Sequence, residues 1–184
     1  SVSEIEGIFH THSHDDHFAG LPTLMQTDHR IRYFATPLVR AAVTKKLTAM
    51  LGFEEREFEH YFDVHDLDFD AWNKIDGMEV RPIFSPHPVD TTCFYFRAMG
   101  PEGYKTYGHM ADIASFGVLE SMLTEDETAP GISEARLTRT KSKYHVPTNV
   151  KKIDIGGGLI HGAAIDFKND PSEKIILAHT EREY

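Results

Sequence analysis

Two kinds of hydrophobic pattern alternate along the chain. Residues 37–51 repeat apolar positions with helical spacing, and Gly52 follows as a helix stop signal. Residues 91–97 are instead rich in aromatic and β-branched side chains, which is typical of a strand. The same reasoning predicts strands at 6–10, 32–35, 79–84, 105–107, 152–160 and 174–178, and helices at 18–25, 54–65, 113–123 and from the end of the acidic loop 124–133 to before Pro147. Because strands and helices alternate, we expect one α/β domain over residues 1–184.

The composition is that of a globular protein without a membrane segment. Of the 184 residues, 40% are hydrophobic and 26% are charged. A helix needs about 20 apolar residues in a row to span a bilayer, and no apolar run approaches that length. The first residues are polar and acidic, so they do not resemble a secretory signal. Cys93 is the only cysteine, which excludes an intrachain disulfide. We therefore expect a cytoplasmic protein with no membrane segment.

The charge is acidic overall but uneven. A net charge of -10 argues against bulk binding to nucleic acid or to an anionic membrane. Six basic residues and no acid lie between Arg136 and Lys152. This segment could meet an anionic substrate, or it could be a solvated helix face or loop.

The run Thr11-His12-Ser13-His14-Asp15-Asp16-His17 carries the strongest chemical signal. Its residues His12, His14, Asp16 and His17 place three imidazoles and a carboxylate within six residues, at the end of a predicted strand. Such nitrogen and oxygen donors suit zinc, and also manganese or iron. On a tight loop, His12 and His14 can face one ion while Asp16 and His17 face a second. A histidine-rich surface loop is the plain alternative, and it is disfavoured because the cluster does not stand alone.

Three further candidate ligands follow predicted strands. His87 lies in a Ser-Pro-His-Pro turn, Asp112 stands between a strand and a helix, and His179 ends the strand 174–178. Each one alone is more often an ordinary turn residue. Together they obey the rule that sites in α/β proteins lie beyond the carboxyl ends of strands, and Asp112 could bridge two ions.

With these residues in place, the chain resembles the metallo-β-lactamase superfamily of hydrolases, whose signature is His-x-His-x-Asp-His followed by distant His, Asp and His ligands. The resemblance implies an αβ/βα sandwich with a binuclear metal site. It implies these ligands: His12, His14 and His87 for the first metal, Asp16, His17 and His179 for the second, and Asp112 as the bridge. The family has several strands before its motif that this chain lacks, and the motif begins only ten residues in. We therefore expect a fragment of a longer protein without the N-terminal strands.

Gly20-Leu21-Pro22 after the motif resembles the phosphodiesterase branch, which includes the tRNA 3′-processing endonucleases. A late histidine pair, His161 and His179, is similar to the same branch. The match implies that His161 lies beside the metals as a proton donor to the leaving group. The alternative is a strand-end histidine packed against the sheet, and Gly162 departs from the acid that this branch has after its histidine.

Two other positions depart from known patterns. His14 stands where oxygen-reducing di-iron relatives have a glutamate, so a redox role is disfavoured. The usual Gly-Asp is replaced by Gly108-His109-Met110-Ala111-Asp112, which makes His109 a rival of Asp112 as ligand.

The function expected from these features is hydrolysis of a phosphodiester with two divalent ions, zinc before manganese or iron. A metal-bound water has its pKa lowered from about 15.7 to about 7, which supplies hydroxide near neutral pH. We expect Asp16 and His161 to act in catalysis, with Lys141, Lys143 or His145 offsetting charge on the substrate. The expected partner is a small-molecule phosphodiester or other ester, with nucleic acid less favoured. The alternatives are a thioester, lactone or β-lactam hydrolase, and a non-catalytic, metal-stabilised regulatory or assembly module.

Overall fold

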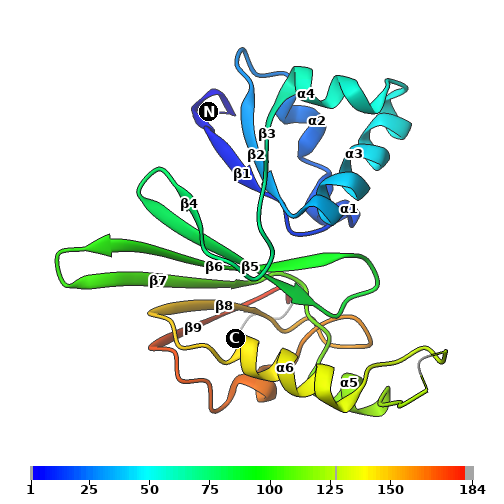
Figure 1. The fold of residues 1–184 in the computed structure, drawn as a ribbon, viewed down its shortest axis with the longest axis vertical. Coiled ribbons are helices and arrows are strands. Elements are labelled where there is room, and N and C mark those ends of the chain that lie inside the picture. The colour runs from blue at the N-terminus through cyan, green and yellow to red at the C-terminus, as the bar shows by residue number, and fades with distance from the viewer. Residues whose placement is uncertain (1, 127, 181–184) are drawn as a thin grey trace. The chain divides into compact units, whose positions relative to one another are not determined.

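A computed structural model describes residues 2–126 and 128–180 (Figure 1). The chain forms two compact units. Unit 1 runs to Phe69 and also includes Val89–Thr92. Unit 2 comprises Asp70–Pro88 and the residues from Cys93 onward. Each unit has its own sheet, its own helices and its own hydrophobic core.

Unit 1 contains a three-stranded parallel sheet in the order β1-β2-β3. Parallel neighbours need long crossovers, and here these carry helices. The elements are η1 (Val2–Glu4), β1 (Gly7–Phe9), α1 (Asp15–Phe18), α2 (Leu21–Leu24), β2 (Ile31–Ala35), α3 (Pro37–Leu51), η2 (Glu55–Glu57), α4 (Phe58–Tyr61) and β3 (Phe62–Asp66). Its core packs one face of α3 against β2 and β3, with Val43, Leu47 and Phe62 wholly buried.

Helix α3 has the bounds that the sequence predicts. Pro37 occupies its first turn, where a missing N–H does no harm. Val39, Val43 and Leu47 recur every fourth residue and form the buried stripe. Gly52 ends the helix in the left-handed conformation, with φ of 74°.

Unit 2 contains a six-stranded sheet in the order β4-β5-β6-β7-β8-β9. Its elements are β4 (Asn73–Ile75), β5 (Met78–Ser85), β6 (Thr91–Gly100), β7 (Gly103–Met110), α5 (Phe116–Ser121), α6 (Glu134–Tyr144), β8 (Val150–Asp154), η3 (Ala164–Phe167) and β9 (Lys174–Ala178). The pairs β4–β5 and β6–β7 are antiparallel, whereas β7, β8 and β9 are parallel. In the parallel part Met110 pairs with Ile153, and Asp154 pairs with Ala178. The three strands therefore end side by side.

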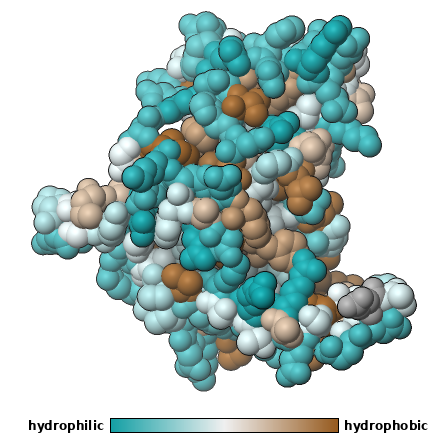
Figure 2. Space-filling view, viewed as in Figure 1, coloured by the Kyte–Doolittle hydropathy of each residue, from teal (hydrophilic) through white to brown (hydrophobic). Residues whose placement is uncertain are grey.

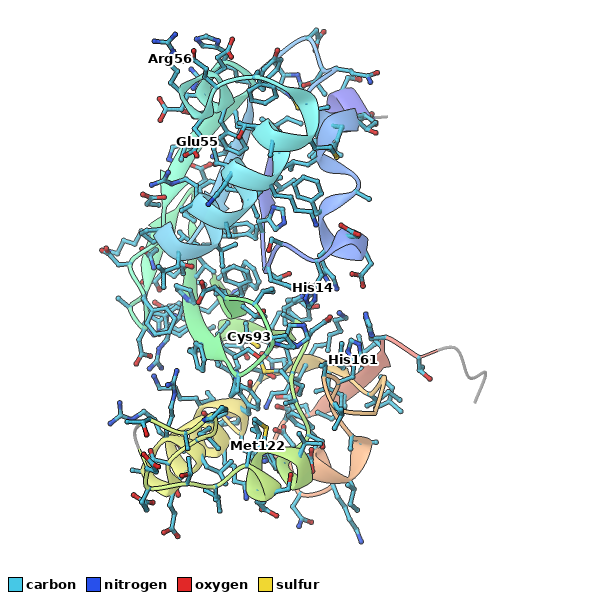
Figure 3. All side chains as sticks on the ribbon, turned by 90° about the vertical axis from the view of Figure 1, so that its right-hand side faces the viewer. His14, Glu55, Arg56, Cys93, Met122 and His161 are labelled. Atoms are coloured by element: carbon cyan, nitrogen blue, oxygen red, sulfur yellow. The ribbon has the colours of Figure 1, made fainter. Side chains whose placement is uncertain are left out.

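The core of unit 2 is closed by polar contacts as well as apolar ones. Ser115 and Ser133 cap α5 and α6, each accepting a hydrogen bond from a backbone N–H in the first turn. The buried Tyr144 hydroxyl donates to Ser85 Oγ at 2.9 Å. Cys93 is wholly buried in this core (Figure 3). Burial raises the pKa of its thiol to about 12.

Two predicted elements are wrong in part, one in its type and one in its length. The predicted helix 54–65 forms only η2 and α4, and the chain then turns into strand β3. Phe62 and Val64 alternate with polar residues there, and this period of two fits a strand better than a helix. The predicted strand 152–160 stops at Asp154, because the glycines at 156–158 follow and Leu159 and Ile160 lie in a turn. Strand β4 was not predicted.

The predicted helix 18–25 is also different, since it is two short helices. The first, α1, already begins at Asp15, so Asp15 and Asp16 lie in its first turn rather than before it. His14 is the N-cap residue, and its side chain makes no capping hydrogen bond. Helix α1 therefore begins within the motif, three residues before the start of the predicted helix.

None of the described helices could cross a membrane, since the longest of them has 15 residues. Figure 2 shows that hydrophilic residues dominate the face it draws, with hydrophobic residues in smaller areas between them.

Candidate metal centre

In unit 1 the histidine motif follows directly from strand β1. The His10 backbone N–H donates to the Phe34 carbonyl at 2.9 Å, which extends the pairing with β2. The next carbonyl, of Thr11, accepts from Thr92 N–H at 2.9 Å. The chain is therefore fixed on both sides just before His12, which is 0% exposed. Thr11 Oγ1 lies 3.1 Å from His12 Nδ1, a contact of the kind that orients metal-binding histidines.

His10 belongs to the framework beneath the motif. It is buried, and its ring centroid is 5.6 Å from that of Tyr33. Burial lowers its pKa from 6.5 to about 4, so the ring is neutral near neutral pH. The sequence did not single it out as a ligand.

The four expected ligands of unit 1 lie together. The ring of His12 is 4.9 Å from that of His14 and 4.1 Å from that of His17, measured between centroids. Helix α1 carries Asp16 and His17 on one turn, with Asp16 Oδ2 3.2 Å from His17 Nε2. Lys46 on α3 stabilises the loop, because its Nζ atom donates to the Ser13 carbonyl at 2.6 Å and to Asp15 Oδ1 at 2.5 Å.

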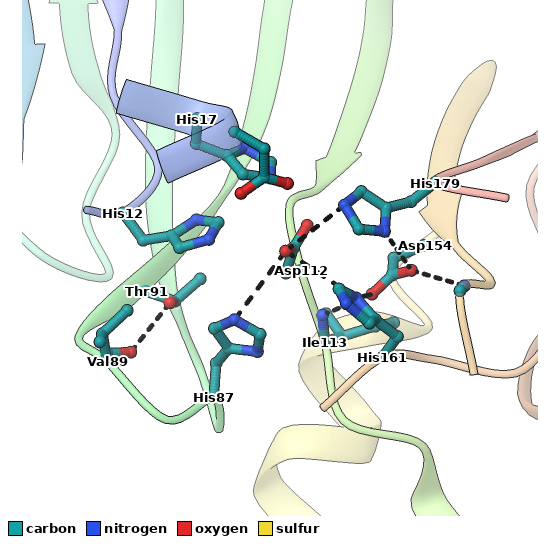
Figure 4. A network of polar contacts seen from close by, with 12 residues as sticks. His12, His17, His87, Val89, Thr91, Asp112, Ile113, Asp154, His161 and His179 are labelled. Atoms are coloured by element: carbon teal, nitrogen blue, oxygen red, sulfur yellow. Dashed lines mark hydrogen bonds and ion pairs between the residues drawn. The ribbon is translucent and has the colours of Figure 1, made fainter. Parts of the chain in front are cut away.

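In unit 2 the buried carboxylate of Asp112 is the centre of the expected ligands. Asp112 is 1% exposed, and its backbone carbonyl accepts a hydrogen bond from Ser85 Oγ at 2.8 Å. Three imidazole nitrogens lie 3.8 Å from its Oδ2 atom (Figure 4): His87 Nε2, His161 Nδ1 and His179 Nε2. The turn after β5, the segment after β7, the loop after β8 and the residue after β9 thus meet at one carboxylate.

His109, the rival of Asp112, is placed differently. It lies within β7, and its Nδ1 atom is 3.0 Å from the Tyr107 hydroxyl. Among the described residues, His109 belongs to none of the clusters of three or more His, Cys, Asp or Glu side chains that could hold a metal ion. The geometry therefore favours Asp112.

A second buried carboxylate, Asp154, was missed in the sequence. It ends β8 and is 0% exposed. Its Oδ1 accepts from Gly156 N–H at 2.8 Å, and its Oδ2 accepts from the N–H groups of Ile113 and Gly162 at 3.1 and 3.2 Å. His161 Nδ1 lies 3.0 Å from the same Oδ2. The sequence prediction missed it because the strand expected at 152–160 placed Asp154 in its interior, whereas the observed β8 ends at Asp154, where the same rule placed the other ligands.

Asp154 also belongs to a cluster with metal-binding potential inside unit 2. Asp112, Asp154, His161 and His179 each offer one ligand atom, and these atoms all lie within 4.8 Å of one another. His161 occupies the loop after β8 rather than a strand end (Figure 3). The structure therefore places it beside the expected ligands of this unit.

Two glycines allow this close approach. A Cβ atom on Gly156 would lie 2.9 Å from His161 Cγ, and one on Gly162 would lie 2.4 Å from the Asp154 carbonyl oxygen. No side chain fits at either position without displacing the loop. At Gly162, this lack of space is a physical reason for glycine where the phosphodiesterase branch has an acid.

His179 has a strained backbone. Its φ of 60° is in the left-handed region, which costs a non-glycine residue about 1–2 kcal/mol. The bend directs its ring to the two buried carboxylates, with Nδ1 3.7 Å from Asp154 Oδ1. Strain of this kind is concentrated at functional sites.

The donor set fits a divalent metal ion. Burying two carboxylates is costly unless opposite charge compensates it, and a cation would do so. Imidazole nitrogen and carboxylate oxygen suit zinc and also manganese or iron, so these donors do not select one ion.

Half of the six basic residues between Arg136 and Lys152 form ion pairs within unit 2. Lys141 pairs with Glu120, Lys143 with Asp70, and the buried Lys151 with Asp170. His145 also contacts Asp170, at 3.2 Å. The side chains of Lys141, Lys143 and His145, which were expected to offset substrate charge, thus already face carboxylates.

Comparison with known proteins supports the fold. A family model described as a β-lactamase superfamily domain matches residues 1–129. No curated protein matches the sequence. Among solved structures, the fold is similar to that of the metallo-β-lactamase fold protein YhfI from Bacillus subtilis, with a TM-score of 0.63 at 11% identity over 100% of this chain and 67% of that one.

Two further structures are similar in fold. Yeast PDE1 has a TM-score of 0.60 at 14% identity, and the match covers 98% of this chain and 58% of that one. The short form of human tRNase Z (ELAC1) has a TM-score of 0.58 at 15% identity, over 98% of this chain and 74% of that one. This chain thus spans roughly three fifths to three quarters of the length of these proteins. The family model covers well over half of the chain, so the protein belongs to the β-lactamase superfamily and has the metallo-β-lactamase fold that its motif predicted.

Proposed function

We propose that this chain is a hydrolase that uses two divalent metal ions, zinc first among them, to cleave phosphodiesters. The observation that carries the proposal is the buried Asp112 carboxylate with three imidazoles at 3.8 Å. The motif of unit 1 adds four more donors of the same chemistry. The metals would be held by His12, His14, Asp16, His17, His87, Asp112 and His179. When bound, such ions act as Lewis acids and provide a hydroxide nucleophile near neutral pH.

The side chains of the protein would divide the remaining work. Asp16 is 59% exposed, so it can reach both the site and the entering water, and we assign it to orienting the nucleophile. Asp154 accepts from Nδ1–H of His161 and so fixes the ring. The proton for the departing alkoxide would then come from Nε2 of His161. Asp154 acts as a positioning residue in this scheme.

The phosphodiester is favoured over other esters by two features. The Gly-Leu-Pro sequence after the motif resembles the phosphodiesterase branch, and proteins named PDE1 and tRNase Z share the fold. A small molecule is favoured over nucleic acid because the net charge is -10 and three of the basic residues from Arg136 to Lys152 pair with acids.

The direct test is turnover of bis(p-nitrophenyl) phosphate by protein loaded with zinc or manganese. Outer-shell partners of metal ligands typically contribute about 10–100-fold, so loss of a ligand should lower kcat/KM by more than about 100-fold. We expect this for His12→Ala and for Asp112→Asn. The matched control is His60→Ala, which removes an exposed histidine of α4 and should leave turnover unchanged.

Other outcomes would redirect the proposal. Turnover of a thioester, lactone or β-lactam without any on phosphodiesters would keep the metal site and replace the substrate. Bound metal without turnover on the whole ester panel would indicate a metal-stabilised regulatory or assembly module. Full activity of His12→Ala would remove the metal mechanism itself.

A further inference from the structure

Unit 2 contains a pocket next to the site. It encloses about 470 Å³, a size typical of small-molecule sites. Its walls come from the end of β5 with the following turn, from α5 and from the start of α6. Apolar side chains, among them Phe84, Pro88, Leu119 and Ile132, make up most of the lining. A cavity with this lining binds the apolar body of a ligand.

The pocket reaches the proposed metal ligands through His87. This residue lines the pocket, and its Nε2 atom is 3.8 Å from the Asp112 carboxylate. A molecule in the pocket would therefore lie against one of the groups that we assign to the reaction. The cavity is in the right place for a part of the substrate next to the bond that is cleaved.

Apolar side chains are also exposed at the rim. Leu159 is 80% exposed, Met122 is 45% exposed and Ile160 is 39% exposed, and all three line the pocket. The loop that carries Leu159 is held at its base, where Gly157 N–H donates to the Gly162 carbonyl at 3.1 Å. A fixed, exposed apolar rim around an apolar cavity marks a binding site.

One cation completes the pocket. Among the described residues, Arg136 is the only lysine or arginine that lines the pocket, and its guanidinium lies 4.5 Å from the centroid of the Phe84 ring. Within the described part of the chain, no carboxylate forms an ion pair with Arg136, whereas Lys141 and Lys143 of the same helix are paired. A guanidinium with open donors binds carboxylate, phosphate or sulfonate groups.

We propose that this pocket binds the organic group of the substrate, and that this group has an apolar body and an anionic substituent that pairs with Arg136. The role in turnover rests on the proposed hydrolase function, but the binding of an amphiphilic anion does not. The substrate class is therefore an ester with a large apolar, negatively charged organic group rather than a small polar one.

The binding is tested by fluorescence titration of the full chain with 1-anilinonaphthalene-8-sulfonate, an aromatic anion. We expect one site per chain. Met122→Ser and Arg136→Gln should each raise Kd at least fivefold. The matched controls are Met99→Ser, at an exposed methionine of β6, and Arg139→Gln, at an exposed arginine of α6, since neither lines the pocket. Both controls should leave Kd unchanged, and thermal melts should show that all four variants fold.

A parallel measurement links the pocket to turnover. With p-nitrophenyl esters of methyl and of carboxynaphthyl phosphate, kcat/KM should be at least tenfold higher for the naphthyl compound. Met122→Ser and Arg136→Gln should reduce this preference by lowering kcat/KM for the naphthyl compound, whereas the controls Met99→Ser and Arg139→Gln should leave kcat/KM unchanged for both esters. Leu159→Ser offers a second rim variant should Met122→Ser fold poorly.

The two proposals can fail separately. If no ester is hydrolysed but the pocket variants weaken dye binding, the pocket stands and the hydrolase function falls. If both esters are cleaved equally well, the substrate class is wrong. If Kd is the same in the pocket variants and the wild type, or rises equally in the controls, the pocket proposal is overturned.

Discussion

The two units assemble their expected ligands in opposite ways. Unit 1 takes all four from the six consecutive residues His12–His17, on one loop and the helix that follows it. Unit 2 takes its three expected ligands from segments after β5, after β7 and after β9, and His161 comes from a fourth segment, after β8. The first set is a local feature of the chain, whereas the second exists only because four distant segments are folded together.

The carboxylates of the two sets differ in burial. Asp16 of unit 1 is 59% exposed. Asp112 and Asp154 of unit 2 are 1% and 0% exposed, and Asp154 accepts three backbone hydrogen bonds. A buried carboxylate that accepts several hydrogen bonds connects the segments that donate them, and so contributes to the stability of the fold. Changes to the buried carboxylates of unit 2 should therefore affect folding as well as function, while a change to Asp16 should affect function alone.

The largest effect on stability is expected at Asp154. Asp154→Ala leaves three backbone N–H groups and His161 without this acceptor in a buried place, which should lower the free energy of unfolding by about 3 kcal/mol or more. Asp16→Ala should change it by less than about 0.5 kcal/mol. Urea denaturation of metal-free protein gives both values. Equal losses in the two variants would abolish the distinction between the units.

Metal binding should stabilise the folded protein by slightly less than the loss expected for Asp154→Ala. Zinc at 100 times its Kd would contribute about 2.7 kcal/mol, seen as a rise in Tm that a chelator reverses. His14→Ala in unit 1 and Asp112→Asn in unit 2 should both reduce this rise. Asp15→Asn is the control, since Asp15 is 92% exposed and is not an expected ligand. If zinc raised the Tm of His14→Ala as much as that of the wild type, unit 2 would bind metal without that histidine.

A pair of glycines provides a finer comparison. A methyl group at Gly162 would lie 2.8 Å from Ile113 Cγ1 as well as close to the backbone of Asp154, so Gly162→Ala should destabilise the protein by about 2 kcal/mol. Gly20 of unit 1 has helical angles and no atom within 4 Å of an added Cβ. Gly20→Ala should therefore be neutral or stabilising by up to about 1 kcal/mol. Thermal denaturation of the two variants tests this, and a loss at Gly20 would contradict it.

The smallest effect concerns the buried thiol of Cys93. Burial raises the pKa of Cys93 to about 12, so almost no thiolate is present at pH 8. Native protein should react with Ellman's reagent only as fast as it unfolds, and denatured protein should react at once. Rapid labelling of the native protein would show that the core of unit 2 opens far more readily than its packing indicates.

The sequence predicted much of this molecule because many signals are local. The bounds of α3 follow from its apolar stripe, Pro37 and Gly52, all within a few turns. The histidine motif is equally local. The helix predicted at 54–65 was wrong where Phe62 and Val64 begin a strand, because a short amphipathic segment fits both periods and pairing with β2 decides between them.

The sequence by itself determined the family, the histidine motif and most of the candidate ligands, since residue type and spacing carry that information. Only the tertiary structure favoured Asp112 over His109 and revealed Asp154. Both outcomes depend on the register of β7, β8 and β9, which ends the three strands together and places Asp154 beside Ala178, one residue before His179. Register is set by packing between segments far apart in the chain, and no local pattern contains it.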